Sequence, residues 1–242
     1  MTDIIRVGTG IKAVDSMIGG GLPKNSIVGL LGPAGVGKSI FAMQFVLCGA
    51  KAGGKSVFIS LEEPRENIDR VLRIMDWGKE FRDYEKKRLI SVLCISYTDL
   101  EKMYSTLFKK ISNDARIKRL VIDSFNCFFS YCNYSNMSAD DYKLNEMRKI
   151  MNASFSMFRA KELNTLLILE DTDDLSDPIN RHIPFMVDGI IRLDFLSLGN
   201  LERRIFIPKM RWTEQYESSL PFKITRKGIV LQKDKDLRKD FS

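Results

Sequence analysis

The sequence predicts an α/β fold, with a mostly parallel, twisted sheet flanked by helices and extended by antiparallel strands near the C-terminus. Before Met186, apolar runs typical of buried strands alternate with stretches of helical periodicity, the order of a parallel sheet. From Met186 onward, short strand-like segments follow one another without a long helix, which indicates antiparallel strands. No linker, internal repeat or low-complexity segment interrupts the chain. We therefore expect one domain over residues 1–242.

The expected strands are short apolar runs bounded by turn residues. One of them, Leu120 to Asp123, ends in an acidic residue, and those after Met186 are separated only by turns. The expected strands span residues 27–31, 56–61, 89–95, 120–123, 165–169, 187–193, 203–209, 222–225 and 229–231.

The expected helices carry apolar residues three and four positions apart. Pro64 suits the first turn of one helix, and Asp99 is a candidate cap for the next. Glycines followed by Pro23 end the first helix. The stretch from Asn126 to Met137 is expected to be a loop or a short irregular helix. The expected helices span residues 12–18, 40–47, 64–75, 99–112 and 140–163.

The composition is ordinary for a globular protein. Of 242 residues, 44% are hydrophobic and 29% are charged. The apolar runs are too short to span a bilayer and the N-terminus lacks a signal-peptide layout, so we expect a cytoplasmic protein without a membrane partner. A formal net charge of +7 makes nucleic acid a possible partner without establishing one. Four cysteines and one histidine, His182, lack the spacing of zinc ligands, so we expect reduced thiols.

One stretch fits the phosphate-loop pattern G-x-x-x-x-G-K-[ST], with an apolar strand before it and a buried helix after it. Its glycines allow several backbone N–H groups to point at a phosphate chain, and the helix N-terminus adds positive partial charge. Lys38 is expected to reach the β- and γ-phosphates of a nucleoside triphosphate, and the Ser39 hydroxyl to bind Mg²⁺. The residues expected at the nucleotide are Gly32, Pro33, Ala34, Gly35, Val36, Gly37, Lys38, Ser39 and Ile40.

Three acidic residues follow strands that should end at the same edge of the sheet as the phosphate loop. Asp123 is expected to help Ser39 hold Mg²⁺. Glu62 and Glu63 follow the strand at 56–61, and one of them is expected to orient the water that attacks the γ-phosphate. Which of the two does so stays open. The alternative for both is an acidic first helical turn that complements the helix dipole.

Together these motifs resemble the KaiC-like family, a branch of the RecA superfamily of ATPases. The resemblance covers nearly the whole chain, and its specificity lies in the combination, since only the phosphate loop would be specific alone. The matching segments are residues 8–23, 32–39, 58–64, 121–124, 187–193, 203–213 and 221–229.

The resemblance implies a RecA-type core that forms a homo-oligomer, commonly a hexameric ring or a filament, with ATP and Mg²⁺ between subunits. It implies that Glu62 and Glu63 act in hydrolysis. It also implies that Lys209 and Arg211 reach the ATP of the neighbouring subunit, where their charge stabilises developing phosphate charge. Without the resemblance, both would be interpreted as solvated charges on an edge strand.

The chain departs from the family pattern at two places. Trp212 replaces the usual glycine after Arg211, and Thr213, Glu214 and Gln215 occupy the stretch where a histidine often follows. Trp212 is expected either to stack on a base or a neighbouring subunit, or to be buried as packing. Leu169 precedes Glu170 where relatives tend to carry Ser or Thr, which predicts weaker sensing of the γ-phosphate and slow hydrolysis.

Three functions stay open at this point. The first is an oligomeric ATPase that acts as a regulatory switch on an unidentified protein partner. The second is a role in DNA repair or recombination, with residues 126–141 and 170–184 lining the DNA path; the first of these loops is rich in aromatic residues and the second is acidic. The third is a nucleotide-gated protein-binding module with little or no turnover.

Overall fold

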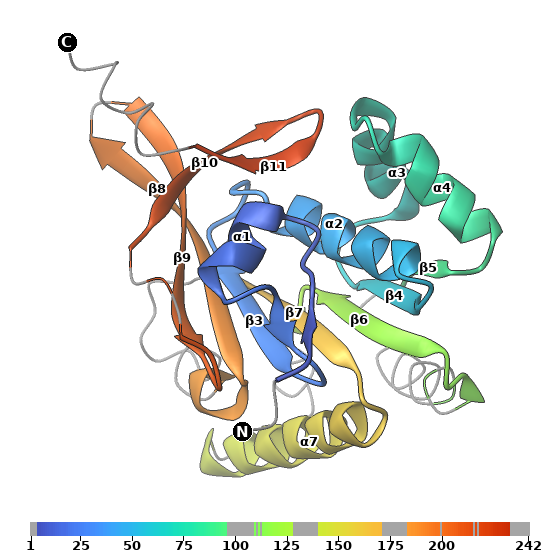
Figure 1. Ribbon diagram of the computed structural model, residues 1–242. Helices are drawn as coiled ribbons and strands as arrows, with labels where there is room; N and C mark the ends of the chain where they lie inside the picture. The colour runs from blue at the N-terminus through green and yellow to red at the C-terminus, as the bar shows by residue number, and fades with distance from the viewer. Residues whose placement is uncertain are drawn as a thin grey trace.

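The computed structural model describes residues 4–95, 109, 111, 113–127, 140–170, 183–198, 200–214, 216 and 218–232. At its centre is a nine-stranded sheet with the strand order β11-β10-β9-β8-β3-β7-β6-β4-β5 (Figure 1). The strands are β3 (Ile27–Gly32), β4 (Lys55–Ser60), β5 (Ile90–Cys94), β6 (Ile117–Asp123), β7 (Asn164–Glu170), β8 (Gly189–Leu198), β9 (Asn200–Met210), β10 (Leu220–Thr225) and β11 (Gly228–Leu231). A separate two-stranded ribbon pairs β1 (Arg6–Val7) with β2 (Leu22–Pro23).

The sheet changes direction at β9. Across the sheet, the neighbouring strands β5, β4, β6, β7, β3 and β8 all run parallel. By contrast, β9, β10 and β11 pair antiparallel. This arrangement confirms the predicted fold class, a mostly parallel sheet with an antiparallel C-terminal extension. The antiparallel strands need only turns between them, which is why the chain after Met186 carries no long connecting helix.

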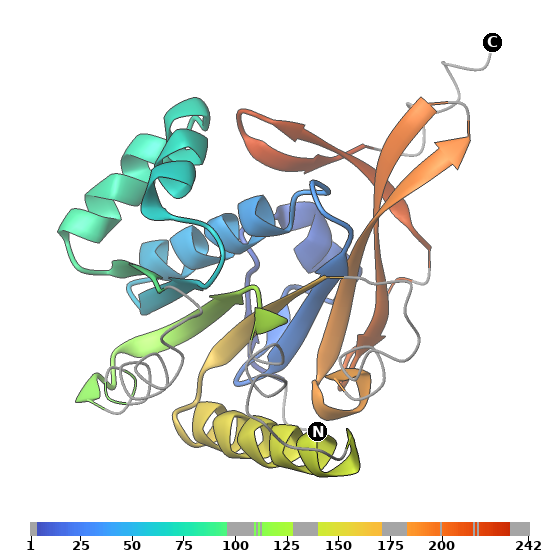
Figure 2. The same cartoon turned by 180° about the vertical axis from the view of Figure 1, so that it is seen from behind.

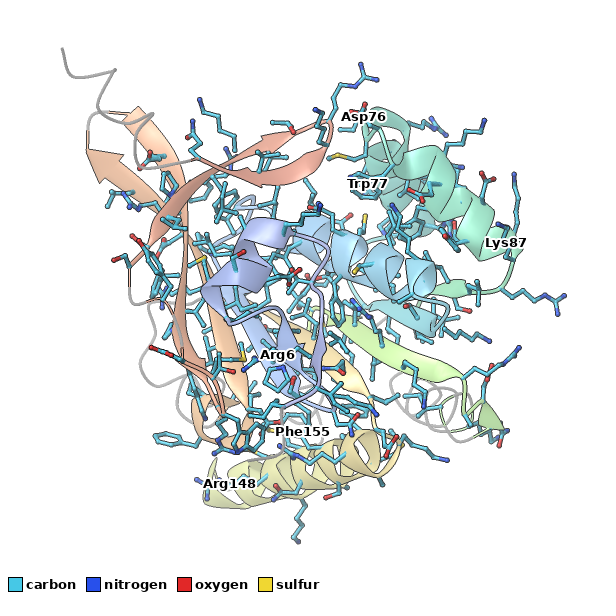
Figure 3. All side chains as sticks on the ribbon, in the orientation of Figure 1. Arg6, Asp76, Trp77, Lys87, Arg148 and Phe155 are labelled. Atoms are coloured by element: carbon cyan, nitrogen blue, oxygen red, sulfur yellow. The ribbon has the colours of Figure 1, made fainter. Side chains whose placement is uncertain are left out.

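Helices cover both faces of the sheet (Figures 1 and 2). The helices α1 (Lys12–Met17), α2 (Lys38–Lys51), α3 (Arg65–Ile74) and α4 (Gly78–Lys86) lie on one face, and α7 (Asp140–Ala160) lies on the other. Alternate residues of a strand point to opposite faces. Val28 of β3 therefore packs in the α2 layer, whereas Ile27 packs in the α7 layer. Phe155 points from α7 toward the sheet and belongs to the hydrophobic core between α7 and the sheet (Figure 3).

Most of the predicted elements are present, with shifted ends. The expected helix at 40–47 begins earlier, at Lys38, and Pro64 precedes α3 rather than forming its first turn. Helix α4 was not expected, and β8 and β9 are longer than their predicted spans. Most of the helix expected at 99–112 and the stretch from 128 to 139 lie outside the described residues.

The parallel pairing brings the candidate site to one edge of the sheet. The phosphate loop follows β3, and the register pairs Leu31 of β3 with Leu169 of β7. The next two strands after β7 in the sheet are β6 and β4, and there Ser60 at the end of β4 pairs with Asp123 at the end of β6. Because these strands all run in the same direction, their carboxyl ends lie at a common edge, where open α/β sheets bind ligands.

Candidate nucleotide-binding site

The loop between β3 and α2 has the backbone of a phosphate-binding turn. Gly35 and Gly37 have φ angles of 74° and 117°, a region that glycine enters without steric cost. A Cβ atom at Gly37 would also lie 2.8 Å from Cδ1 of Ile224 on β10, so a side chain there would require that methyl group to shift. Helix α2 begins directly after this turn, and its first N–H groups provide a positive partial charge at the loop.

Lys38 is buried within the loop that precedes it. Its Nζ atom donates hydrogen bonds to the carbonyl oxygens of Gly32, at 2.6 Å, and Pro33, at 3.0 Å. The ammonium group is thus held at the mouth of the glycine turn, beside the N-terminus of α2. That is the position in which a phosphate chain on the loop would meet it.

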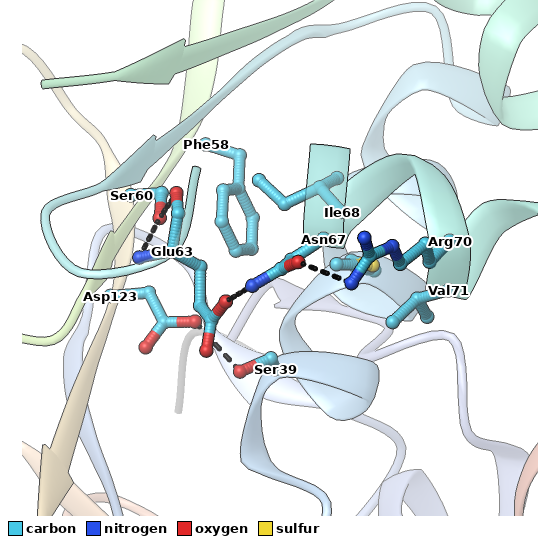
Figure 4. A pocket seen from close by; sticks show the side chains of 10 residues that line it. Ser39, Phe58, Ser60, Glu63, Asn67, Ile68, Arg70, Val71 and Asp123 are labelled. Carbon is cyan, nitrogen blue, oxygen red and sulfur yellow. Dashed lines mark hydrogen bonds between the residues drawn. The ribbon is translucent and has the colours of Figure 1, made fainter. Parts of the chain in front are cut away.

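Ser39 and Asp123 meet across the gap between α2 and β6. The Ser39 hydroxyl donates to Oδ2 of Asp123 at 2.8 Å (Figure 4). Burial raises the pKa of Asp123 from 3.8 to about 6, against the lowering effect of the Ser39 hydrogen bond. The nearby carboxylates of Glu62 and Glu63 raise this pKa further, and Lys38 lowers it. The peptide bond between Asp123 and Ser124 is cis.

The two adjacent glutamates have different neighbours. Oε1 of Glu62 accepts a hydrogen bond from the Ser124 hydroxyl at 2.7 Å and one from the Cys127 thiol at 3.2 Å. Burial, followed by the contact with Glu62, raises the pKa of Cys127 to about 12, so the thiol keeps its proton at neutral pH. Glu63 instead lies with Ser39 and Asp123 at a common cavity (Figure 4).

That cavity has a volume of about 410 Å³ and lies between α2, β4 and α3. One end is polar and carries the groups of the candidate magnesium site, whereas the other is lined largely by apolar side chains. This mixture is typical of small-molecule sites, in which few polar groups orient a ligand against an apolar wall. The lining residues are Ser39, Met43, Phe58, Ser60, Glu63, Asn67, Ile68, Arg70, Val71 and Asp123.

Lys209 and Arg211 lie far from the phosphate loop of their own chain. Met210 pairs with Gly189, which pairs with Val28 near the beginning of β3, whereas the loop follows the end of β3. Gly32 lies five positions after Ile27 along β3, a span of about 16 Å. The structure therefore brings Lys38, Ser39, Glu63 and Asp123 together and does not bring Lys209 or Arg211 to them.

Both cations are held at the beginning of β3. Lys209 Nζ donates to the carbonyl oxygens of Pro184, at 2.7 Å, and Val187, at 2.8 Å. Its pKa is lowered by burial and by the charge of Arg211. Arg211 Nη1 donates to Oδ1 of Asp188 at 3.3 Å.

Comparison with known proteins assigns the family. A family model described as "ATPase: KaiC" matches residues 7–236, nearly the whole chain. The chain belongs to the KaiC family. A UPF0273 protein of Methanopyrus kandleri is 30% identical to it, over 95% of this chain and 93% of that protein. The circadian clock oscillator protein KaiC of Thermostichus vulcanus is 27% identical, over 94% of this chain but 42% of that protein.

A solved structure shows the same fold for another KaiC-like protein. The crystal structure of a KaiC-like protein from Pyrococcus horikoshii superposes with a TM-score of 0.76 at 29% identity. The match covers 96% of this chain and all of that one. Among the described residues, no helix has the length and apolar character needed to cross a bilayer.

Asp188 is a functional candidate that sequence reasoning missed in this KaiC-family chain. Its side chain is 3% exposed, and it accepts hydrogen bonds from the backbone N–H of Ile27, from Arg159 and from Arg211. It belongs to a matching V-D-G segment, but no spacing rule connects it with Arg159 on α7. Asn67 and Arg70 were missed as well, and the only sequence signal is that Asn67 follows Glu63 by one helical turn.

Trp212 is exposed, so the alternative of a buried packing role is wrong. Its relative exposure is 59%, and its φ angle of 55° lies in the left-handed region that favours glycine. Arg6 donates to its carbonyl oxygen at 3.2 Å, which helps to hold this turn beside Arg211. The indole is thus on the surface, one residue after Arg211 along the chain.

Proposed function

We propose that this chain is a Mg²⁺-dependent ATPase that binds ATP at its phosphate loop, and that residues 1–242 form one ATPase domain. The observation that carries the proposal is the meeting of Lys38, Ser39, Asp123 and Glu63 at one sheet edge. Family membership supports nucleotide binding of the ATPase type. Adenine as the base follows from the family alone.

The described side chains fit the two groups that the proposal requires. Hydroxyl and carboxylate oxygens are the ligands that Mg²⁺ prefers, and Ser39 and Asp123 present both within 2.8 Å of each other. Lys38 and the backbone of residues 32–39 provide the cationic groups and N–H donors that phosphate requires. When bound, Mg²⁺ would neutralise phosphate charge.

We assign the water-orienting role to Glu63 rather than Glu62. Glu63 faces the cavity that contains Ser39 and Asp123, so its carboxylate can accept a proton from a water molecule there. Glu62 is engaged by Ser124 and Cys127 on the side of β6. Its proposed role is to hold the turn after β6 in place.

We further propose that Lys209 and Arg211 act on the ATP of a neighbouring subunit in a homo-oligomer. Their distance from the loop of their own chain supports this assignment, because a contact within one chain would need a large movement of β9. In a head-to-tail assembly, each subunit would present these cations to the next. The ring or filament and its size follow from the resemblance.

Slow turnover is the expected behaviour, because Leu169 offers no hydroxyl where relatives tend to have one. The alternative function, a nucleotide-gated protein-binding module, predicts tight binding of ATP without turnover. The loops that could line a DNA path, at 126–141 and 170–184, lie mostly outside the described residues, so a role in DNA repair or recombination stays a prediction.

The test is steady-state release of inorganic phosphate from Mg²⁺-ATP by the wild-type protein and by Lys38→Ala. Turnover in the wild type that is lost in Lys38→Ala, and lost when EDTA removes Mg²⁺, supports the ATPase. If both proteins are inactive but the wild type alone binds ATP tightly, the binding-module alternative is correct. If neither binds ATP, the proposed function is wrong.

A further inference from the structure

The first turns of α3 form the wall of the cavity that faces Glu63. Asn67 and Arg70 both line the cavity, and they lie on the same side of the helix because they are three residues apart (Figure 4). Asn67 is half-buried, whereas Arg70 is exposed at the rim. Neither residue belongs to the phosphate loop or to the candidate magnesium ligands.

A series of hydrogen bonds runs from Arg70 to Asn67 and from Asn67 to Glu63. Arg70 Nη1 donates to Oδ1 of Asn67 at 3.3 Å, and Asn67 Nδ2 donates to Oε2 of Glu63 at short range (Figure 4). A guanidinium group can only donate, so it requires the oxygen end of the Asn67 amide. That leaves the amide nitrogen for Glu63, and the orientation of Asn67 is thereby fixed.

Hydrogen bonds hold both the backbone and the carboxylate of Glu63. Its backbone N–H donates to the Ser60 hydroxyl at 3.0 Å, and the same hydroxyl donates to the Glu63 carbonyl at 2.6 Å. Its carboxylate is held through Oε2 by Asn67. Among the described residues, no hydrogen bond engages the other oxygen, Oε1, which leaves it available to a water molecule in the cavity.

We propose that Asn67 is a positioning residue that holds the Glu63 carboxylate in the geometry for water activation, and that Arg70 fixes the orientation of the Asn67 amide. This inference rests on the proposed function, in which Glu63 orients the attacking water. A neutral amide suits this task because it restricts the carboxylate without adding charge to it. A general base contributes only when its oxygen stays within hydrogen-bond reach of the water, and small misplacements are costly in rate.

The test compares two substitutions of similar size at Asn67. Asn67→Leu removes the donor, and we expect kcat for Mg²⁺-ATP hydrolysis to fall about tenfold with KM unchanged within about twofold. Asn67→Gln keeps an amide donor and should recover part of the lost rate. A residue that only braces the first turn of α3 would change thermal stability and not separate kcat from KM in this way. Arg70→Ala should lower kcat less than Asn67→Leu does, and Arg73→Ala, an exposed arginine on the same helix, serves as the control.

A double-mutant cycle shows whether Asn67 acts through Glu63. Glu63→Gln alone should lower kcat by about 100-fold or more. In the Glu63→Gln protein, Asn67→Leu should cause no further loss, because the carboxylate that it positions is gone. If Asn67→Leu keeps the wild-type kcat, or lowers it equally in both backgrounds, the inference is wrong while the proposed function stands. A wild-type protein no faster than Lys38→Ala would overturn the proposed function and this inference together.

Discussion

At the scale of single residues, Asp123 shows a conflict between stability and the proposed function. The residue is 8% exposed, and burial raises the pKa of its carboxyl group to about 6. A buried carboxylate without a cationic partner in direct contact is costly, and the Ser39 hydroxyl offsets only part of that cost. The residue is explained by the cation that it would bind rather than by the stability of the protein alone.

Asp123→Asn should therefore stabilise the protein in the absence of metal. Because the pKa of the folded state lies above that of the unfolded state, the penalty is present above about pH 6 and disappears as the pH falls toward 4. At pH 7.5 with EDTA, we expect the free energy of unfolding to rise by about 2 to 3 kcal/mol, but by only about 1 kcal/mol at pH 4.5. Urea unfolding of the variant and the wild type at both pH values measures this change in the free energy of unfolding. The variant should also lose Mg²⁺-dependent tightening of ATP binding.

Asp188→Asn is the matched control, because Asp188 is also buried but is paired differently. Its carboxylate accepts from Arg159 and Arg211, so the neutral variant weakens two charged contacts and should destabilise the protein. The two substitutions are thus expected to have opposite signs at pH 7.5. A loss of stability in Asp123→Asn under these conditions would contradict the account of its burial.

At the scale of elements, the end of α7 carries a residue that does not suit its backbone. Glu162 has a φ angle of 53°, and the N–H groups of Glu162 and Leu163 donate back to Arg159, at 2.9 Å, and Phe158, at 3.0 Å. This is the left-handed turn that commonly ends helices, where glycine is preferred. Glu162→Gly should raise the free energy of unfolding by about 0.5 to 1 kcal/mol, as the urea midpoint would show.

The control places glycine one position earlier. Lys161 still donates from its backbone N–H to the Met157 carbonyl at 3.0 Å, so it belongs to the last helical turn. Lys161→Gly should lower the free energy of unfolding by up to about 1 kcal/mol, because glycine is a poor helix former. If both variants shift the midpoint in the same direction, the left-handed turn is not the cause.

The hairpin of β10 and β11 packs on the helix that carries the phosphate loop. Oε1 of the buried Gln44 on α2 accepts a hydrogen bond from the N–H of Ile229 at 2.9 Å. Gln44→Leu should lower the free energy of unfolding by about 1 to 3 kcal/mol, because that N–H loses its partner in the interior. Because Ile224 of the same hairpin lies close to Gly37, ATP affinity should fall as well. Lys223→Ala, an exposed position on β10, should change neither urea stability nor ATP affinity.

The elements that sequence patterns predicted are those whose local signal and packing agree. Strand β3 is apolar at every position because both of its faces are covered, and the glycine turn after it is a fixed pattern. Helix α4 has no capping side chain before it, begins at Gly78 and buries little besides Phe81, so no start signal or apolar stripe marked it. The position of α4 is determined by the contacts of Phe81 in the hydrophobic core, and the sequence does not show those contacts.

The same distinction applies to the candidate site. The phosphate loop, Asp123 and the two glutamates could be predicted because each lies at or just after the end of a strand, and parallel strands end at one edge. The choice between Glu62 and Glu63 could not, because it depends on which of two adjacent side chains meets Ser124 and which faces the cavity. Asn67 and Asp188 likewise depend on contacts made only in three dimensions.

At the scale of the whole molecule, the phosphate loop and Arg211 lie at opposite ends of strand β3. The phosphate loop lies beyond the end of β3, whereas Asp188 holds Arg211 at its beginning, where Ile27 donates to the same carboxylate. If Arg211 acts on ATP, a second copy of the chain must bring it to the loop. The complete site would then exist only between subunits, and assembly would be a condition for turnover.

Mixing two inactive variants tests this directly. Lys38→Ala subunits keep Arg211 but lack the loop lysine, and Arg211→Ala subunits have the reverse defect, so each should be inactive alone. In a head-to-tail assembly mixed at equal amounts, about a quarter of the interfaces combine an intact loop with an intact Arg211, and the mixture should regain about that share of wild-type turnover. Mixing Arg211→Ala with the double variant Lys38→Ala/Arg211→Ala should restore nothing, since neither chain supplies the arginine. A mixture as inactive as its components, although light scattering shows that they assemble together, would place the action of Arg211 within its own chain or remove it from catalysis.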